Sequence, residues 1–296
     1  MRSPAILYFS LLMACKGSKM SESRDIESLP AADTGWDEIG AGANITCGLR
    51  RDRSIACWGD PGDEVQDSPD GEYSSLEVGR NFACALNGER QVTCWGSDAS
   101  GVVSAVASDP VQQLSAGYEH VCVLVEGVVQ CWGEDRWGAC DVPALETPVE
   151  LVSSGTVFTC ALLANGEIQC WGTDEMDLLD PPTGPWATMT SGGNHACALD
   201  AGGFATCWGQ DWYNKLEAPG DSLVLMDAGP EETCAVTQDG SVACWGWEAD
   251  VNDGVTLSDG PVQISTGFDH ACVLDSAHRI TCWGDNTDGQ LDVPVR

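Results

Sequence analysis

Short runs in which apolar and polar residues alternate follow one another from Trp36 to the end of the chain. Alternation with a period of two is typical of β-strands that bury one face. One type of run holds a cysteine with an apolar residue two positions later, as in Cys160-Ala-Leu162. The next run holds an apolar residue and then Cys-Trp, as in Ile168-Gln-Cys-Trp171. No helical spacing accompanies these runs, so the pattern predicts an all-β fold of antiparallel strands.

One unit occurs seven times along the chain. The triplet Cys-Trp-Gly recurs at intervals of 37 to 39 residues. A second cysteine lies nine or ten positions before the cysteine of each triplet, and a glycine lies five positions before that second cysteine. Three features that keep their register over seven copies define an internal repeat. The glycines are Gly42, Gly79, Gly117, Gly155, Gly192, Gly229 and Gly267.

Each copy predicts four strands. The first precedes the glycine, as in Val111–Leu114, the second holds the first cysteine, and the third ends in Cys-Trp-Gly. The turn between the second and third strands ends in a left-handed glycine in residues 164–166 and 238–240, and residues 126–127 fit a two-residue turn. A fourth, weaker strand is expected after the triplet, where an apolar residue often lies seven positions past the glycine, as at Leu179.

The repeats predict a seven-bladed β-propeller of units of about 37 residues. Short strands without helices favour a propeller over a helical solenoid, and a closed ring hides most strand edges. The expected blades are residues 36–72, 73–110, 111–148, 149–185, 186–222, 223–260 and 261–296.

The two cysteines of each copy face each other across the second and third strands in this register. Cα atoms of a non-hydrogen-bonded antiparallel pair lie roughly 4.5 Å apart, within the range of a disulfide. One alternative is that the paired cysteines bind metal ions, but no histidine lies at ligand spacing, which disfavours this role. A second alternative is that they are reduced, buried thiols. The predicted disulfides are Cys47–Cys57, Cys84–Cys94, Cys122–Cys131, Cys160–Cys170, Cys197–Cys207, Cys234–Cys244 and Cys272–Cys282.

Each tryptophan of the triplets points to the opposite blade face from its cysteine. Its predicted cross-strand neighbour is a small residue, which leaves room for an indole that packs on the next blade. We therefore interpret these tryptophans as scaffold. They are Trp58, Trp95, Trp132, Trp171, Trp208, Trp245 and Trp283.

The net charge excludes some classes of binding partner, and the cysteine content indicates the cellular compartment. The chain carries 13 Lys+Arg against 46 Asp+Glu, a formal net charge of −33. This charge repels phosphates, so we expect no nucleic-acid binding and no adhesion to an anionic membrane through a basic patch. Sixteen cysteines favour an oxidising compartment.

The N-terminus supports export. The apolar run Ala5–Met13 fits the hydrophobic part of a signal peptide and is too short to span a bilayer. Residues Leu12-Met-Ala-Cys15 resemble the lipobox of bacterial lipoproteins, which implies that Cys15 is lipidated; an ordinary cleaved signal is the alternative. The expected organisation is a signal peptide at 1–14, the lipidated cysteine with a flexible tether at 15–35 and the propeller at 36–296. The expected location is the bacterial cell envelope, with the outer membrane favoured over a periplasmic or extracellular site.

The repeats resemble those of the regulator of chromosome condensation family in its compact bacterial form. The last copy carries the resemblance best, with Gly267-Phe-Asp-His270-Ala-Cys272-Val-Leu274, then Ile280-Thr-Cys282-Trp283-Gly284-Asp-Asn286 and Gly289-Gln-Leu291. The resemblance implies a seven-bladed propeller. It does not fix a function, because such propellers include exchange factors, enzyme inhibitors and surface proteins. The uniform repeat length leaves no room for the inserted wedge that the family's exchange factor uses.

The loops after the third strands carry a recurring acid and large aromatic residues that the repeat itself does not need. With strands that alternate in direction, the loops between first and second strands are expected to open on the same face, and they add further aromatic and acidic residues. Aromatic side chains beside charges are typical of binding hot spots, so we expect one face of loops to bind a basic or amphipathic protein surface. The alternative is a solvated acidic rim with its aromatic rings folded back onto the blades. The candidate residues are Asp98, Tyr118, Glu119, Asp135, Trp137, Asp174, Asp211, Trp212, Tyr213, Trp247, Glu248, Phe268 and Asp269.

Other candidate groups have structural interpretations. His120, His195 and His270 hold one repeat position in non-adjacent blades, so we expect hydrogen-bonded structural histidines rather than a metal site. Cys140 is expected to be a small buried residue rather than a reactive thiol. We find no catalytic motif and expect neither a cofactor nor a metal.

These observations predict a monomeric, lipid-anchored, extracytoplasmic propeller that binds an unidentified protein and is not an enzyme. Membrane contact is expected through the lipid alone. Two alternatives remain, a hydrolase or lyase with a site in the central channel and a purely structural envelope lipoprotein. Convergence of polar residues from several blades on the axis would favour the former.

Overall fold

A computed structural model describes residues 35–295 apart from residues 61, 63, 106–109, 248–256 and 258. These residues belong to one unit, Asp33–Arg296. Cys15 and the signal and tether segments lie outside the described residues, as does Glu248. Within the described part, no helix has the length and apolar character needed to span a membrane.

Seven three-stranded antiparallel sheets form the blades within these ranges. The first strands are β1 (Trp36–Ala41), β4 (Tyr73–Val78), β7 (Gln113–Ala116), β10 (Val149–Ser154), β13 (Thr188–Ser191), β16 (Leu223–Ala228) and β19 (Pro261–Thr266). The second strands are β2 (Ile45–Arg50), β5 (Phe82–Asn87), β8 (His120–Val125), β11 (Phe158–Leu163), β14 (His195–Leu199), β17 (Glu232–Thr237) and β20 (His270–Asp275). The third strands are β3 (Ile55–Gly59), β6 (Val92–Gly96), β9 (Val128–Gly133), β12 (Ile168–Gly172), β15 (Ala205–Gly209), β18 (Val242–Gly246) and β21 (Ile280–Gly284).

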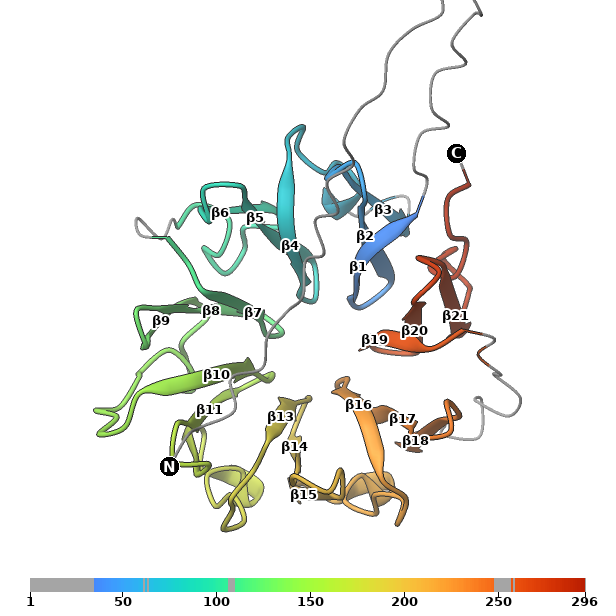
Figure 1. Ribbon diagram of the computed structural model, residues 1–296. Helices are drawn as coiled ribbons and strands as arrows, with labels where there is room; N and C mark the ends of the chain where they lie inside the picture. Colours follow the sequence, from blue (N-terminus) through green and yellow to red (C-terminus); the bar gives the residue numbers. More distant parts are fainter. Residues whose placement is uncertain are drawn as a thin grey trace, which may run out of the picture. The chain divides into compact units, whose positions relative to one another are not determined.

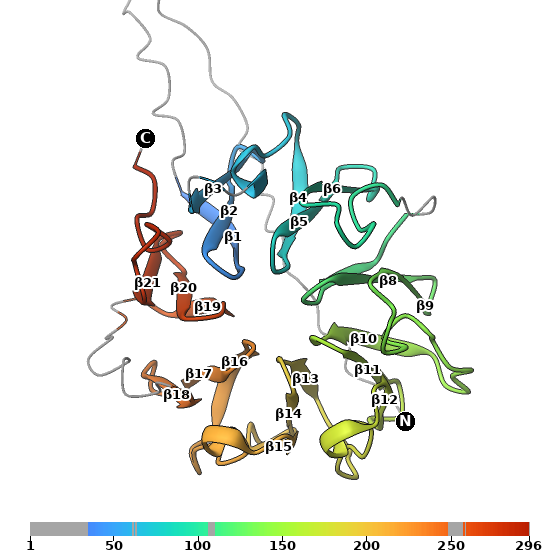
Figure 2. The ribbon, with the colours of Figure 1, turned by 180° about the vertical axis from the view of Figure 1, so that it is seen from behind.

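The sheets are arranged around a common axis with the first strands innermost (Figure 1). The view from behind shows the same order of blades, with the first blade beside the last (Figure 2). Strand β1 contacts both β19 and β20, which closes the ring. The predicted seven-bladed all-β propeller is therefore confirmed.

The glycine before each second strand allows the blades to approach one another at the axis. A Cβ atom on Gly229 would lie 2.4 Å from the carbonyl oxygen of Gly267, and one on Gly267 would lie 2.5 Å from that of Gly42. Real Cβ contacts are not this short, so no larger residue fits without moving backbone. The repeat keeps glycine there because seven inner loops converge on one point.

The cross-strand register is the predicted one. Cys160 faces Cys170 and Thr159 faces Trp171, and the other blades repeat this pairing. All seven predicted disulfides are present, with Cα–Cα distances of 4.0 to 4.1 Å. Gly166 and Gly240 have the left-handed φ expected at the ends of their turns, and residues 126–127 form the two-residue turn.

The expected fourth strand is wrong. In the residues that the structure describes, the segments after the third strands form turns or a single turn of 3₁₀ helix, as in η1 (Glu64–Gln66), η2 (Glu175–Asp177) and η3 (Trp212–Asn214). The side chain that enters the core lies six positions past the glycine, not seven, as at Val65 and Leu178, both fully buried. In six blades, the carbonyl at this buried position accepts a hydrogen bond from the indole N–H of the next blade, which explains why the backbone turns inward. These bonds are Trp58–Gln290, Trp95–Val65, Trp132–Val102, Trp171–Ala139, Trp208–Leu178 and Trp245–Lys215.

Polar side chains on the innermost strands join neighbouring blades. Ser115 Oγ accepts a hydrogen bond from the backbone N–H of Ser154 at 3.0 Å, and Asp227 accepts one from Thr266 at 2.7 Å. These side chains occupy the same repeat position, opposite the first cysteine. They supply hydrogen-bond acceptors to strand edges that would otherwise face each other unpaired.

Candidate functional site

The loops between first and second strands and the segments after the third strands open on one side of the propeller, which we call the loop face. Ser97 N–H donates to the carbonyl of Asn81, and Glu134 N–H donates to that of Glu119. Each blade repeats this bond between its own two loops. The expectation that these loops share one face is therefore confirmed.

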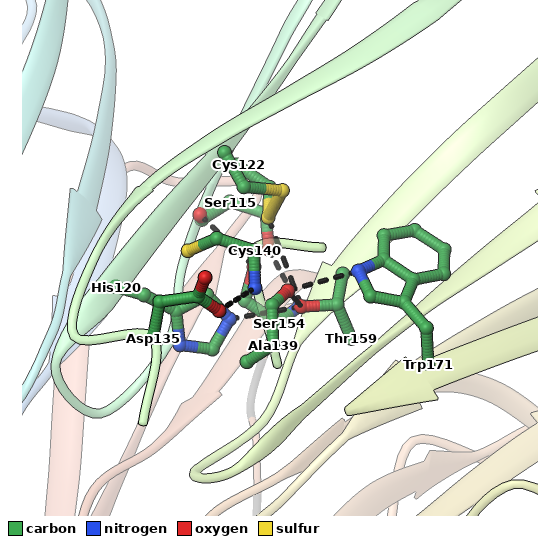
Figure 3. Close-up of a disulfide and its surroundings, with 10 residues drawn as sticks. Ser115, His120, Cys122, Asp135, Ala139, Cys140, Ser154, Thr159 and Trp171 are labelled. Atoms are coloured by element: carbon green, nitrogen blue, oxygen red, sulfur yellow. Dashed lines mark hydrogen bonds between the residues drawn. A yellow bond between two sulfur atoms is a disulfide. The ribbon is translucent and has the colours of Figure 1, made fainter. Parts of the chain in front are cut away.

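The recurring acid of these loops has a structural role that the sequence analysis missed. The carboxylate of Asp135 accepts a hydrogen bond from the N–H of Cys140 at 2.8 Å (Figure 3). Asp98 and Asp211 accept the equivalent bonds from Val103 and Leu216. The acid recurs because it fixes the loop backbone, although its side chain stays exposed.

The large aromatic side chains of the loop face are exposed. The exposed fractions are 46% for Trp137, 63% for Trp212, 52% for Tyr213 and 38% for Trp247. The alternative in which these rings fold back onto the blades is therefore wrong for them. On the opposite face, Phe204 is the only large aromatic residue in the described part of the chain that is exposed to a similar extent.

Three predicted residues of the loops between first and second strands, Tyr118, Glu119 and Phe268, are more enclosed. The guanidinium of Arg80 lies over the ring of Tyr118, 4.6 Å from its centroid, and also pairs with Glu119. Tyr118 and Phe268 are half-buried and line the small cavity around the ring of glycines, about 80 Å³ in volume. Asp174 and Asp269 are exposed.

Tyr213 and Trp247 form an aromatic corner between two neighbouring blades. Their ring centroids lie 4.3 Å apart, and the ring planes meet at 73°. Tyr213 has a left-handed backbone with φ of 63°, and so has Asn214. In the third blade, the position of Asn214 is held by Gly138, which has the same left-handed conformation without steric cost. Met176 and Asp177 hold the same two positions in the fourth blade with φ of 65° and 57°, so the left-handed pair is a feature of this loop in the repeat.

An ion pair joins Lys215, two residues after Tyr213, to Glu231, which is partly exposed. Lys215 Nζ lies 2.6 Å from a carboxylate oxygen of Glu231, and the lysine side chain is fully buried. Lys215 occupies the repeat position of Val65 and Leu178, and its carbonyl accepts the indole N–H of Trp245. Sequence reasoning missed this pair, although a lone lysine at an apolar repeat position was a usable signal.

The three repeat histidines are structural, as predicted. His120 Nε2 lies 2.9 Å from Thr159 Oγ1 of the next blade, and this hydroxyl donates its hydrogen to the carbonyl of Ala139 (Figure 3). The histidine nitrogen is therefore the donor to the threonine. Burial lowers the pKa of His120 to about 4 and of His195 to about 3, so both are neutral at physiological pH.

Cys140 is half-buried rather than fully buried, because the neighbouring Ala139 takes the core position. Burial raises the pKa of the Cys140 thiol to about 12, and the carboxylates of Asp135, Asp141 and Glu134 act in the same direction. A thiol with this pKa has almost no thiolate at neutral pH. In the part of the chain that the structure describes, no group of three or more His, Cys, Asp or Glu side chains is arranged to hold a metal ion.

The central channel is narrow and polar. Its volume is about 220 Å³, and Glu77 and Asp227 are its acidic lining residues. Burial raises the pKa of both, and for Glu77 the charges of Glu38 and Asp227 add to this effect. Both carboxylates accept backbone hydrogen bonds from the next blade, at Ala116 and Thr266. These acids are thus used to join blades.

Comparison with known proteins agrees with this geometry. Residues 262–290 match the family model of the regulator of chromosome condensation (RCC1) repeat. Among solved structures, the ectodomain of the receptor kinase CR4 from Physcomitrella patens has 28% identity and a TM-score of 0.70, covering 83% of this chain and 72% of that one. The ectodomain of ACR4 from Arabidopsis thaliana has 22% identity and a TM-score of 0.71, over 87% of this chain and 97% of that one.

Prp20p from Saccharomyces cerevisiae has 16% identity and a TM-score of 0.68, over 89% of this chain and 85% of its own. Comparison with curated protein sequences finds no match. The match of the last blade to the repeat model and the shared fold confirm the resemblance stated from the sequence. The chain folds as a seven-bladed β-propeller, and its last blade matches the RCC1 repeat.

Proposed function

We propose that this chain is an exported protein-binding propeller that contacts another protein through its loop face. The observation that carries this proposal is the exposure of four large aromatic side chains on that face. Exposed tryptophan and tyrosine beside charged residues are typical of interaction sites. These residues are Trp137, Trp212, Tyr213 and Trp247.

Export is supported by the seven disulfides, because such bonds persist in oxidising compartments. The receptor-kinase relative that is 28% identical is an ectodomain. We also propose that Cys15 carries a lipid and that the segment up to residue 35 tethers the propeller to the bacterial cell envelope. The resemblance of residues 12–15 to a lipobox supports this step.

A role in binding is consistent with the functions of related propellers. Prp20p is described by its binding to Gsp1p and histones. Nothing in that relative identifies the partner here, because a likeness at 16% identity concerns the fold. The partner proposed for this chain is a protein with a basic surface, which complements the net charge of −33.

Charge reversal on the loop face tests the proposal. Asp135 and Asp211 are unsuitable targets, because their carboxylates hold the loop backbone. Asp174 and Glu175 are exposed on the loop face, and the Asp174 carboxylate makes no capping hydrogen bond to η2. We expect the double variant Asp174→Lys/Glu175→Lys to capture less of a specific envelope partner than the wild-type chain does.

A matched control carries the same change in charge on the opposite face. Glu150 and Asp221 are exposed near the starts of the first strands β10 and β16. We expect the variant Glu150→Lys/Asp221→Lys to retain the partner. Equal loss in both variants, or no loss in either, would contradict binding through the loop face.

A further inference from the structure

The corner between Tyr213 and Trp247 has the geometry of two walls of a binding site. The rings come from η3 and from the residue after β18, and they meet at 73° with both rings substantially exposed. Trp212, the most exposed of the large aromatics, adjoins Tyr213 in the chain. Aromatic faces arranged in this way attract a cation, because each ring carries negative charge density on its face.

The corner lies in a sector of the chain that has no exposed lysine or arginine. Between residues 137 and 278 there are 22 Asp and Glu residues against one lysine or arginine, Lys215. Lys215 is fully buried and paired with Glu231. A positive group from outside is therefore attracted to this sector and meets no competing cation there.

The third blade provides a comparison within the same molecule. Trp137 lies four positions past the glycine of its third strand, as Tyr213 does, and is also exposed. Arg136 stands beside it and pairs with Glu134 at 3.3 Å. The loop of the third blade thus carries an exposed cation of its own, whereas the cation in the loop of the fifth blade, Lys215, is fully buried.

We propose that the Tyr213–Trp247 corner binds an exposed arginine or lysine side chain of the partner protein. This inference rests on the proposed function and adds the chemistry that the loop face recognises. The cation lies against the aromatic faces, and the surrounding carboxylates increase its local concentration.

Peptide binding to the full-length exported chain tests this proposal. The probe is a capped hexa-arginine peptide, and its uncharged counterpart is hexa-citrulline, in which each guanidinium is replaced by a neutral urea group. We expect tryptophan fluorescence to change on addition of the arginine peptide and not of the citrulline peptide. We expect Tyr213→Leu and Trp247→Leu each to weaken arginine-peptide binding roughly fivefold or more, the effect of one cation–π contact.

Phe204→Leu is the matched control, because it removes an exposed aromatic side chain from the opposite face of the fifth blade and leaves the charges unchanged. We expect it to bind the arginine peptide as the wild-type chain does. Equal affinity of all three variants, or equal binding of the citrulline peptide, would overturn the proposal. All three residues are surface-exposed, so circular dichroism should show an unchanged fold.

A second comparison separates this inference from the proposed function. If Tyr213→Leu/Trp247→Leu retains the partner while Asp174→Lys/Glu175→Lys loses it, the loop face binds but the corner is not its cation site. If neither double variant loses the partner, binding through the loop face fails as well. Loss in both supports both proposals.

Discussion

Glu38 occupies the repeat position at which two other blades carry glutamine. The amide of Gln113 both accepts from the N–H and donates to the carbonyl of Val152 in the next blade, at 2.9 Å each. Gln263 makes the same pair of bonds with Ile39. Glu38 accepts from the N–H of Leu76, and a carboxylate has no hydrogen to donate to a carbonyl.

We expect Glu38→Gln to stabilise the propeller above pH 7. Burial raises the pKa of Glu38 from 4.5 to about 7. Because the folded chain holds this proton more tightly than the unfolded chain, the wild-type protein loses stability as the pH rises from 4.5 towards 7. The neutral amide removes this loss and supplies one more hydrogen bond, worth about 1 kcal/mol.

Denaturation of both proteins across this pH range measures the effect. The advantage of the variant should grow between pH 4.5 and about 7 and stay level above that. A difference that does not depend on pH would show that folding does not raise the pKa of Glu38, which contradicts this account.

At the scale of the element, the residue types at two contacting positions of neighbouring blades vary together. Three blades begin their second strand with a histidine, and in each case the next blade has a threonine directly before its first cysteine. The contacting pairs are His120–Thr159, His195–Thr233 and His270–Thr46. The other four blades have isoleucine, phenylalanine or glutamate at the histidine position and are followed by alanine or valine. This covariation is visible in the sequence and was not used to predict the contacts.

We expect His120 and Thr159 to be energetically coupled. Thr159→Ala alone leaves the buried Nε2 donor of His120 without a partner, a cost of about 1–3 kcal/mol. The double variant His120→Phe/Thr159→Ala recreates the pair Phe158–Ala196, which stands at the junction of the fourth and fifth blades. It should therefore cost less than the sum of the single changes, by about 1 kcal/mol or more. Urea denaturation of the four proteins measures the coupling, and additive costs would contradict it.

Some elements of the blade can be predicted from the sequence and others cannot. The first three strands, the disulfides and the hairpin turns follow from local alternation and facing cysteines, which are set by the register of two adjacent strands. The fourth segment does not, because its core position holds Ala139, Lys215 and Gln290 as well as larger apolar residues, so hydrophobicity marks it poorly. The exposure of Trp212 and Tyr213 depends on contacts between blades, which local pattern does not contain.

At the scale of the whole molecule, a ring of disulfide-bonded hairpins provides a rigid base for loops that differ between blades. Each disulfide closes a short loop, worth about 2.5 kcal/mol by the loop-entropy relation, and interblade bonds join the inner strands around the axis. The loop backbone is fixed by the recurring acid, as at Asp135. Side chains such as Trp137 and Trp212 are therefore free to differ between blades without loss of fold.

Site-specific photo-crosslinking in the exported protein tests the central claim, that the loop face contacts a protein, most directly. A photoreactive amino acid replaces Trp212 on the loop face or, in a second variant, Phe204 on the opposite face of the same blade. Both positions are exposed, at 63% and 51%. The account predicts a discrete protein crosslink from position 212 and none from position 204. A crosslink from position 204 with none from position 212 would contradict it.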